Sequence, residues 1–277
     1  MSAPPTIDRR PARPDRAPSP SPSPLSMSPA VDRARVLGCA IDRLGMAEMV
    51  DRIDRVIAAR DFAQHAAVNA AKLVAMRQDR ELERIVSAAE LISADGQSVV
   101  WASRVLSDPL PSRVAGIDLM FELFALAERR GYRVFILGAR DDVLARALVR
   151  LRERHPALVV AGARDGYFSD EDADAVADEI ASHRPDIVFV AMPSPRKEYW
   201  LGTYGRRLGA PFIMGVGGSI DVLAGQVRRA PVLAQRLGLE WLFRLAQEPR
   251  RMFPRYLSGN TRFIVYVAGD LARRHRH

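Results

Sequence analysis

The chain has 277 residues, of which 48% are hydrophobic, and its formal net charge at pH 7 is +8. This length and composition allow one good hydrophobic core with an appendage. Because Cys39 is the single cysteine, an internal disulfide is excluded, and this composition suits a reducing cytoplasm. We expect Cys39 to be a small buried residue of the fold. No run reaches the roughly 18 apolar residues of a transmembrane helix.

Residues 1–35 form a leader that differs in composition from the rest of the chain. The first thirty residues contain nine of the 19 prolines, include a Ser-Pro repeat, and have almost no large apolar side chains. Such a segment buries too little surface to offset its ordering entropy, so it is predicted to be disordered. It also lacks the apolar region that follows the charged start of a signal peptide.

Residues 36–225 alternate between helical and extended patterns. Helices are predicted over 46–60, 70–89, from about 97, 118–130, 141–154, after Ser169, and 196–208. Strands are predicted over 65–69, 91–93, 133–138, 158–162, 186–192 and 211–217. Strands that are apolar on both faces and separated by helices indicate a parallel sheet covered on both sides. The fold class is therefore α/β, a Rossmann-like parallel sheet flanked by helices.

Residues 226–277 are predicted to form a basic, aromatic-rich helical appendage. Eleven arginines face only three acids in this segment, so its net charge of +8 equals that of the whole chain. Aromatic residues lie between the arginines, and three leucines, Leu239, Leu242 and Leu245, mark one helical face. A basic aromatic helix can bind an anionic membrane, bind nucleic acid, or pack on the core.

Polar and glycine-rich residues gather where the predicted strands end. These positions are Asn69, Asp95, Gly138, Met192-Pro193 and residues 215–218. Ligands of open parallel sheets bind beyond the carboxyl ends of the strands, so this edge is the predicted binding cleft.

Asp95 lies in the stretch SADGQSVVWASR and has two interpretations. An acid at a strand end commonly caps the next helix. The polar residues Gln97 and Ser98 that follow it also suit a catalytic carboxylate in the cleft. The stretch GVGGS at 215–219 also has two interpretations, because it suits either a phosphate contact or a tight turn. It does not match the dinucleotide pattern GxGxxG.

Arg196 and Lys197 begin a predicted helix, where cations are unfavourable for the helix dipole. A bound anion would explain them, and so would simple solvent exposure. The acids at 170, 172 and 174 match a DxD pattern, but they follow Ser169 as an ordinary acidic first turn. No histidine or cysteine cluster has metal-ligand spacing, so no metal is predicted.

Several stretches together resemble one protein family. They are VNAAKLVAMRQDREL, SADGQSVVWASR, SRVAGIDLM, VFILGAR, DGYFS, RPDIVFVAMPSPRKEYW, GVGGSIDVLAGQVRRAP and GLEWLFRLAQEPRR. In this order, and over about residues 64–255, the sequence resembles the WecG/TagA/CpsF family of bacterial glycosyltransferases. Each stretch alone is weak evidence for the family, but all of them in this order are specific to it.

The resemblance implies inverting transfer from a UDP-sugar to a polyprenyl-diphosphate-linked saccharide, without a metal or other cofactor, by a peripheral protein on the cytoplasmic face of the plasma membrane. It implies that Asp95 is the general base and that Asn69 lies in the pocket. It further implies that the appendage arginines hold the diphosphate and reach the membrane. The substrate-binding residues expected from pattern and resemblance together are Asn69, Gln97, Gly138, Arg196, Lys197, Gly217, Gly218, Arg228, Arg229, Arg244 and Arg251.

Two departures from the family pattern fall in the pocket. Ala67 replaces the usual Thr two residues before Asn69, and Lys197 replaces the usual Gln of an APKQE-like motif. The sequence therefore does not identify which hexose or N-acetylhexosamine is transferred. It does not identify the oligomeric state either, and a homo-oligomer is one possibility. Two alternatives remain besides the transferase: a non-catalytic nucleotide-sugar-binding protein, and a nucleic-acid-binding protein that uses the basic tail. The resemblance favours the transferase with no nucleic-acid partner.

Overall fold

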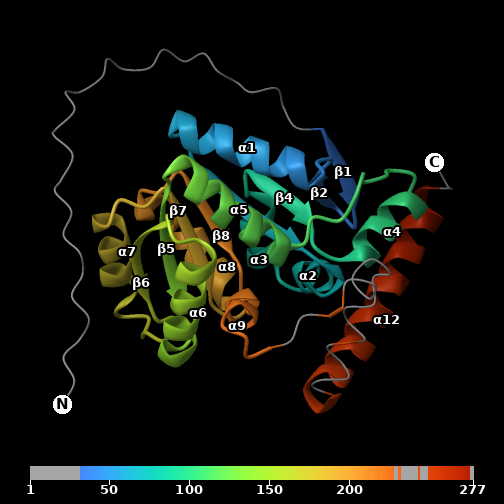
Figure 1. The fold of residues 1–277 in the computed structure, drawn as a ribbon. Helices are drawn as coiled ribbons and strands as arrows, with labels where there is room; N and C mark the ends of the chain where they lie inside the picture. Colours follow the sequence, from blue (N-terminus) through green and yellow to red (C-terminus); the bar gives the residue numbers. More distant parts are fainter. Residues whose placement is uncertain (1–31, 228–229, 232–242, 244–248, 275–277) are drawn as a thin grey trace. The chain divides into compact units, whose positions relative to one another are not determined.

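The structure is a computed structural model that describes residues 32–227, 230–231, 243 and 249–274 (Figure 1). The predicted leader lies outside these residues, apart from its last four positions. In the 249–274 segment, side chains are described for residues 259–273.

A six-stranded parallel sheet confirms the predicted α/β fold. Its strands, in spatial order, are β4 (Leu91–Ala94), β3 (Ala63–Val68), β8 (Phe212–Gly215), β7 (Ile187–Ala191), β5 (Arg133–Gly138) and β6 (Val159–Arg164). Every neighbouring pair is parallel. All six carboxyl ends therefore meet at one edge, as the sequence predicted.

Helices cover both faces of this sheet. One face packs on α1 (Met46–Ala59), α5 (Gly116–Arg130), α6 (Asp141–Arg154) and α9 (Ser219–Leu223). The other face packs on α2 (Ala70–Met76), α3 (Arg80–Ser87), α7 (Ala173–Ser182), α8 (Arg196–Tyr204) and the 3₁₀ helix η1 (Gly205–Leu208). A further helix, α4 (Gln97–Val105), packs at the β4 edge.

Strand β7 shows why an uninterrupted apolar run becomes a central strand. Ile187 and Phe189 point into the core beneath α5, whereas Val188 and Val190 point into the core beneath α7 and α8. All four side chains are fully buried. Successive strand residues face opposite sides, so both sides of a strand sandwiched between helix layers must be apolar.

A two-stranded hairpin, β1 (Arg33–Val36) and β2 (Cys39–Asp42), precedes the sheet and was not predicted. Its buried Asp42 accepts hydrogen bonds from Arg33 Nε at 2.6 Å and from the Ile92 amide at 2.7 Å. These contacts fix the hairpin against β4. Cys39 is buried, as expected.

The helix predicted over 70–89 is two helices, so its prediction as one element was wrong. Asp79 interrupts it, with an extended backbone and a side chain that accepts a hydrogen bond from the Leu82 amide at 2.9 Å. A carboxylate N-cap begins a new helix at this point. The predicted 196–208 helix similarly ends at Tyr204 and continues as η1.

The appendage contains α12 (Pro249–Arg274), which packs on α2. Phe263 is buried in the cluster that includes α2, and Arg77 lies 4.9 Å above the Tyr266 ring centroid and 3.2 Å from the Asp270 carboxylate. Within the residues described, none of the helices combines the length and apolar character needed to cross a bilayer.

Candidate active site

Asn69 and Asp95 follow neighbouring strands and lie side by side. Asn69 ends β3 and caps α2, with its side-chain oxygen 3.0 Å from the Lys72 amide. The Asp95 amide donates to Val68 O at 2.8 Å, which extends the pairing of β4 with β3. A Cβ added to Gly96 would lie only 3.3 Å from Asn69 Cβ, so the two turns are in contact.

The Asp95 side chain is held by the first backbone amide of α5 rather than by the start of α4, the helix that follows it in sequence. Its Oδ1 accepts a hydrogen bond from Gly116 N at 2.8 Å, at the start of α5, and the residue is half-buried. The N-cap of α4 is Gly96, with no side-chain cap. The capping interpretation of Asp95 is therefore wrong for α4, and the carboxylate is instead fixed between β4 and α5.

Lys197 enters this edge from the first turn of α8 and lies against the end of β8. A Cβ added to Gly215 would lie 2.8 Å from Lys197 Cε, and one added to Gly217 would lie 3.6 Å from its Nζ. Only glycine leaves room for the lysine chain at position 215. Gly215, at the end of β8, thus lies beside the Lys197 stem, and Gly217 lies beside its ammonium group.

Two further charged groups complete this cluster. Glu198 Oε1 lies 2.8 Å from Lys72 Nζ and 3.2 Å from Lys197 Nζ. The three side chains are only 6%, 10% and 12% exposed, in the order Glu198, Lys72, Lys197. One carboxylate from α8 therefore joins a lysine of its own helix to a lysine of α2.

The charges in this cluster alter one another's protonation. Although burial opposes it, the Lys72 and Lys197 charges lower the pKa of Glu198 to about 2. Burial lowers the pKa of Lys197, and repulsion from Lys72 lowers it further, whereas Glu198 and Asp95 act in the opposite direction. The attraction between Asp95 and Lys197 places both predicted residues in one electrostatic environment.

Gly138 is the last residue of β5, which lies where the connections between strands change direction across the sheet. From β5 the chain proceeds outward to β6, whereas from β7 it returns toward β8, an arrangement that opens a crevice in doubly wound sheets. Gly138 has φ of 92°, and a Cβ there would lie 2.5 Å from Ala191 O. The backbone turns of β5 and β7 therefore touch, which only glycine permits.

Other predicted residues lie at different places along the same edge. Gln97 begins α4 and is half-buried, and Gly218 is the exposed N-cap of α9. Arg196 lies against Phe168: its Nη2 donates to Phe168 O at 2.5 Å and its guanidinium lies 5.2 Å from the Phe168 ring centroid. Arg228, Arg229 and Arg244 are outside the described residues, as is the side chain of Arg251.

Sequence reasoning missed Lys72 and Glu198, although both leave a signal. Lys72 is three residues after the Asn69 cap, which places it in the first turn of α2 above the strand ends. Glu198 is adjacent to a lysine that was already a candidate. That the two meet follows from the spatial neighbourhood of α2 and α8, which the sequence pattern did not reveal.

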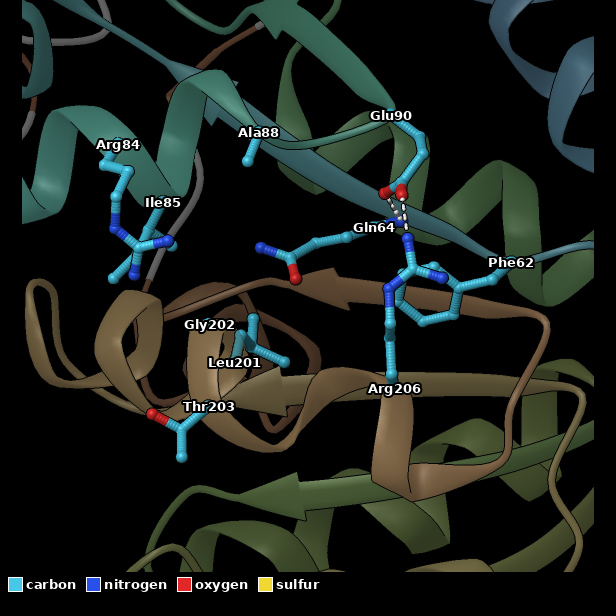
Figure 2. A pocket seen from close by; sticks show the side chains of 10 residues that line it. All are labelled: Phe62, Gln64, Arg84, Ile85, Ala88, Glu90, Leu201, Gly202, Thr203 and Arg206. Atoms are coloured by element: carbon cyan, nitrogen blue, oxygen red, sulfur yellow. Dashed lines mark hydrogen bonds and ion pairs between the residues drawn. The ribbon is translucent and has the colours of Figure 1, made fainter.

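A cavity of about 210 Å³ lies at the opposite edge of the sheet (Figure 2). Its lining includes Phe62, which precedes β3, Glu90, which precedes β4, and Arg206 of η1. Arg206 pairs with Glu90 at 2.8 Å and lies 4.3 Å from the Phe62 ring centroid. This cavity is thus at the amino ends of the strands, away from Asp95 and Lys197.

Fold and site define a Rossmann-like α/β protein with one polar, cationic edge at the carboxyl ends of its strands. Residues 34–277 match the model of the Glycosyl transferase WecG/TagA/CpsF family, and the chain belongs to this family. It is 39% identical, over 186 residues, to the N-acetylglucosaminyldiphosphoundecaprenol N-acetyl-beta-D-mannosaminyltransferase of Bacillus spizizenii. That match covers 65% of this chain and 72% of the relative. The chain is accordingly a glycosyltransferase.

Proposed function

We propose that this protein transfers a hexose or N-acetylhexosamine from a UDP-sugar to a polyprenyl-diphosphate-linked saccharide, with inversion, in the synthesis of a surface or exported polysaccharide. The family and the name of the Bacillus relative support this class of reaction. The observation that carries the proposal is the placement of a fixed carboxylate, Asp95, and a nearly buried ammonium group, Lys197, at the same edge of the sheet.

Asp95 supplies the base of the reaction. The acceptor hydroxyl oxygen forms a bond to the anomeric carbon as the bond from that carbon to the UDP oxygen breaks, and Asp95 takes the hydroxyl proton. The Gly116 amide fixes Oδ1, which leaves Oδ2 as the oxygen that we assign to this proton. A positioned base of this kind contributes about 10²–10⁴-fold to the rate.

The leaving UDP gains negative charge, which needs preorganised positive partners. Lys197 is the partner proposed here, because its ammonium group lies beside Gly217, where the chain leaves β8. A cation that is already in place stabilises this charge without reorganisation at the moment of reaction. The chain's own residues thus supply both the base and the charge for the leaving group.

A panel of donors tests the proposal. The full chain is incubated with UDP-hexoses or UDP-N-acetylhexosamines and a polyprenyl-diphosphate-linked saccharide, and released UDP is measured. We expect release that depends on the acceptor with at least one donor, and an inverted anomeric configuration in the product. Binding of UDP-sugars without acceptor-dependent release would instead indicate a non-catalytic nucleotide-sugar-binding protein.

We further propose that the basic appendage holds the protein on the inner face of the plasma membrane. A basic residue near an anionic bilayer contributes about 1 kcal/mol, and residues 226–277 carry a net charge of +8. We expect binding to vesicles that contain anionic lipid, weakened by salt and absent with neutral lipid. Retention on DNA or RNA without vesicle binding would contradict membrane docking and favour the nucleic-acid alternative.

A further inference from the structure

The chain contains only two lysines, and both contact the same carboxylate oxygen. Of its 41 basic residues, 39 are arginines, and the two lysines are Lys72 and Lys197. Their ammonium nitrogens lie 2.8 Å and 3.2 Å from Glu198 Oε1, in a cluster that is almost completely buried. A chain that uses arginine at nearly every basic position has lysine at this one place.

The surroundings explain why lysine rather than arginine is suitable here. The Lys197 side chain passes so close to Gly215 that a Cβ there would lie 2.8 Å from Cε and 3.0 Å from Cδ. An ammonium group is a compact point charge, whereas a guanidinium is a wide planar fork. The space beside Gly215 and Gly217 accordingly suits a cation that meets one oxygen rather than two.

The charges in this cluster do not balance. Two ammonium groups share one carboxylate, which leaves one positive charge in a nearly buried place. Buried charges are costly unless they are paired. Asp95 also attracts Lys197, but less strongly than Glu198, which contacts its ammonium group directly. The excess positive charge therefore lies beside the glycines at the sheet edge, where a ligand would approach.

We propose that Lys72, Glu198 and Lys197 form a cationic triad in which Lys197 binds an anionic oxygen of the donor and Lys72 acts as a positioning residue through Glu198. This inference rests on the proposed function. The anion comes either from the diphosphate of the donor or from a carboxylate on the transferred sugar. In both cases the same ammonium group recognises a negatively charged oxygen.

The proposal gives Lys72 a role that Lys197 alone does not fulfil. Without Lys72, Glu198 would neutralise Lys197 and no excess charge would remain for the donor. The neutral variant Lys72→Met therefore weakens donor binding at pH 7, although it raises the pKa of Lys197 by removing a repelling charge.

Because there are only two lysines, lysine-selective NMR observes this cluster directly. The full chain labelled with [¹³Cε]lysine gives two side-chain signals, which Lys72→Met and Lys197→Gln assign. Each signal is followed during titration with pH, and then with UDP, inorganic diphosphate, UDP-glucose and UDP-glucuronic acid. We expect the Lys197 signal to move on binding and its pKa to rise, because a bound anion favours the charged ammonium.

The two sources of the anion give different results. If Lys197 meets the diphosphate, UDP and all UDP-sugars shift its signal, and Lys197→Gln weakens all of them by about tenfold or more. If it meets a sugar carboxylate, only UDP-glucuronic acid shows these effects. An unmoved Lys197 signal with every probe at saturation, or unchanged affinities in Lys197→Gln, overturns the proposal.

Double variants test the link between the two lysines. We expect Lys72→Met to weaken binding in the wild-type background and to have little further effect in Lys197→Gln. Lys72→Arg, which keeps the charge, restores part of the affinity. Equal effects of Lys72→Met in both backgrounds would overturn its positioning role. Thermal unfolding of each variant confirms that it is folded.

The same measurements separate this inference from the proposed function. Donor binding that moves the Lys197 signal, without acceptor-dependent UDP release, supports the triad and contradicts the transferase reaction. Acceptor-dependent UDP release with a Lys197 signal that does not move supports the transferase reaction and contradicts the triad.

Discussion

Replacing Asp95 by Asn lowers acceptor-dependent UDP release by about 10²–10⁴-fold, the contribution of a positioned general base. Asn keeps a side-chain oxygen that accepts the hydrogen bond from Gly116, now 2.8 Å from Asp95 Oδ1, so the turn between β4 and α5 is retained. The amide has no basic oxygen that can take the acceptor proton. We therefore expect the loss in kcat, with UDP-sugar affinity changed much less, measured by steady-state kinetics with a fixed acceptor.

The control for this variant is Asp142→Asn, which removes a carboxylate from the exposed start of α6. Asp142 pairs with Arg140 and Arg146 on the surface, where such pairs contribute little. We expect wild-type turnover from it. If folded Asp95→Asn turns over at a rate close to that of the control, the base is another residue and the mechanism proposed here is wrong.

The fold was predictable because its strands are distinctive in sequence. The short uninterrupted apolar runs of β5 and β7 are typical of strands in a sheet that is covered on both faces. The hairpin β1–β2 was missed because it is short and depends on Asp42, whose partners Arg33 and Ile92 are distant in sequence from one another. The helix boundary at Asp79 was missed because this single capping residue lies within a sequence whose apolar residues keep a helical period.

The site was predictable only to the level of the sheet edge. Parallel pairing brings all strand ends together, so Asn69 and Asp95 were expected at the same edge of the sheet once their strands were assigned. The direction of a side chain is not encoded in that pattern. Arg196 and Lys197 are adjacent in sequence, yet one lies on the Phe168 ring and the other is buried beside Gly215. The ion cluster with Lys72 depends on how α2 and α8 lie across the sheet.

Replacing Glu198 by Gln is expected to have the largest effect on stability. It removes the one carboxylate that Lys72 and Lys197 share and leaves two ammonium groups in a nearly buried place. Removing one partner of a buried ion pair costs about 3–5 kcal/mol, because the remaining charge is uncompensated. We expect the free energy of unfolding, measured by urea denaturation at pH 7, to fall by that amount.

The matched control is Glu81→Gln, which breaks an exposed pair with Arg84 at 2.6 Å. Exposed pairs contribute little to stability, so this variant should unfold close to the wild-type midpoint. Similar small losses from both glutamate variants would show that the Glu198 carboxylate does not offset the buried lysine charges, and the triad would lose its electrostatic basis.

The pH dependence gives this prediction a definite sign. The folded pKa of Glu198, about 2, is below its ordinary value of 4.5, so its stabilisation is complete above pH 4.5 and is lost as pH falls toward 2. The difference in unfolding free energy between wild type and Glu198→Gln should therefore shrink across that range. Buried His65, whose pKa burial lowers to about 3, also destabilises the protein in acid, but it does so in both proteins and cancels in the difference. A difference that stays constant from pH 7 to pH 3 would mean that the Glu198 charge is not the source of the stability.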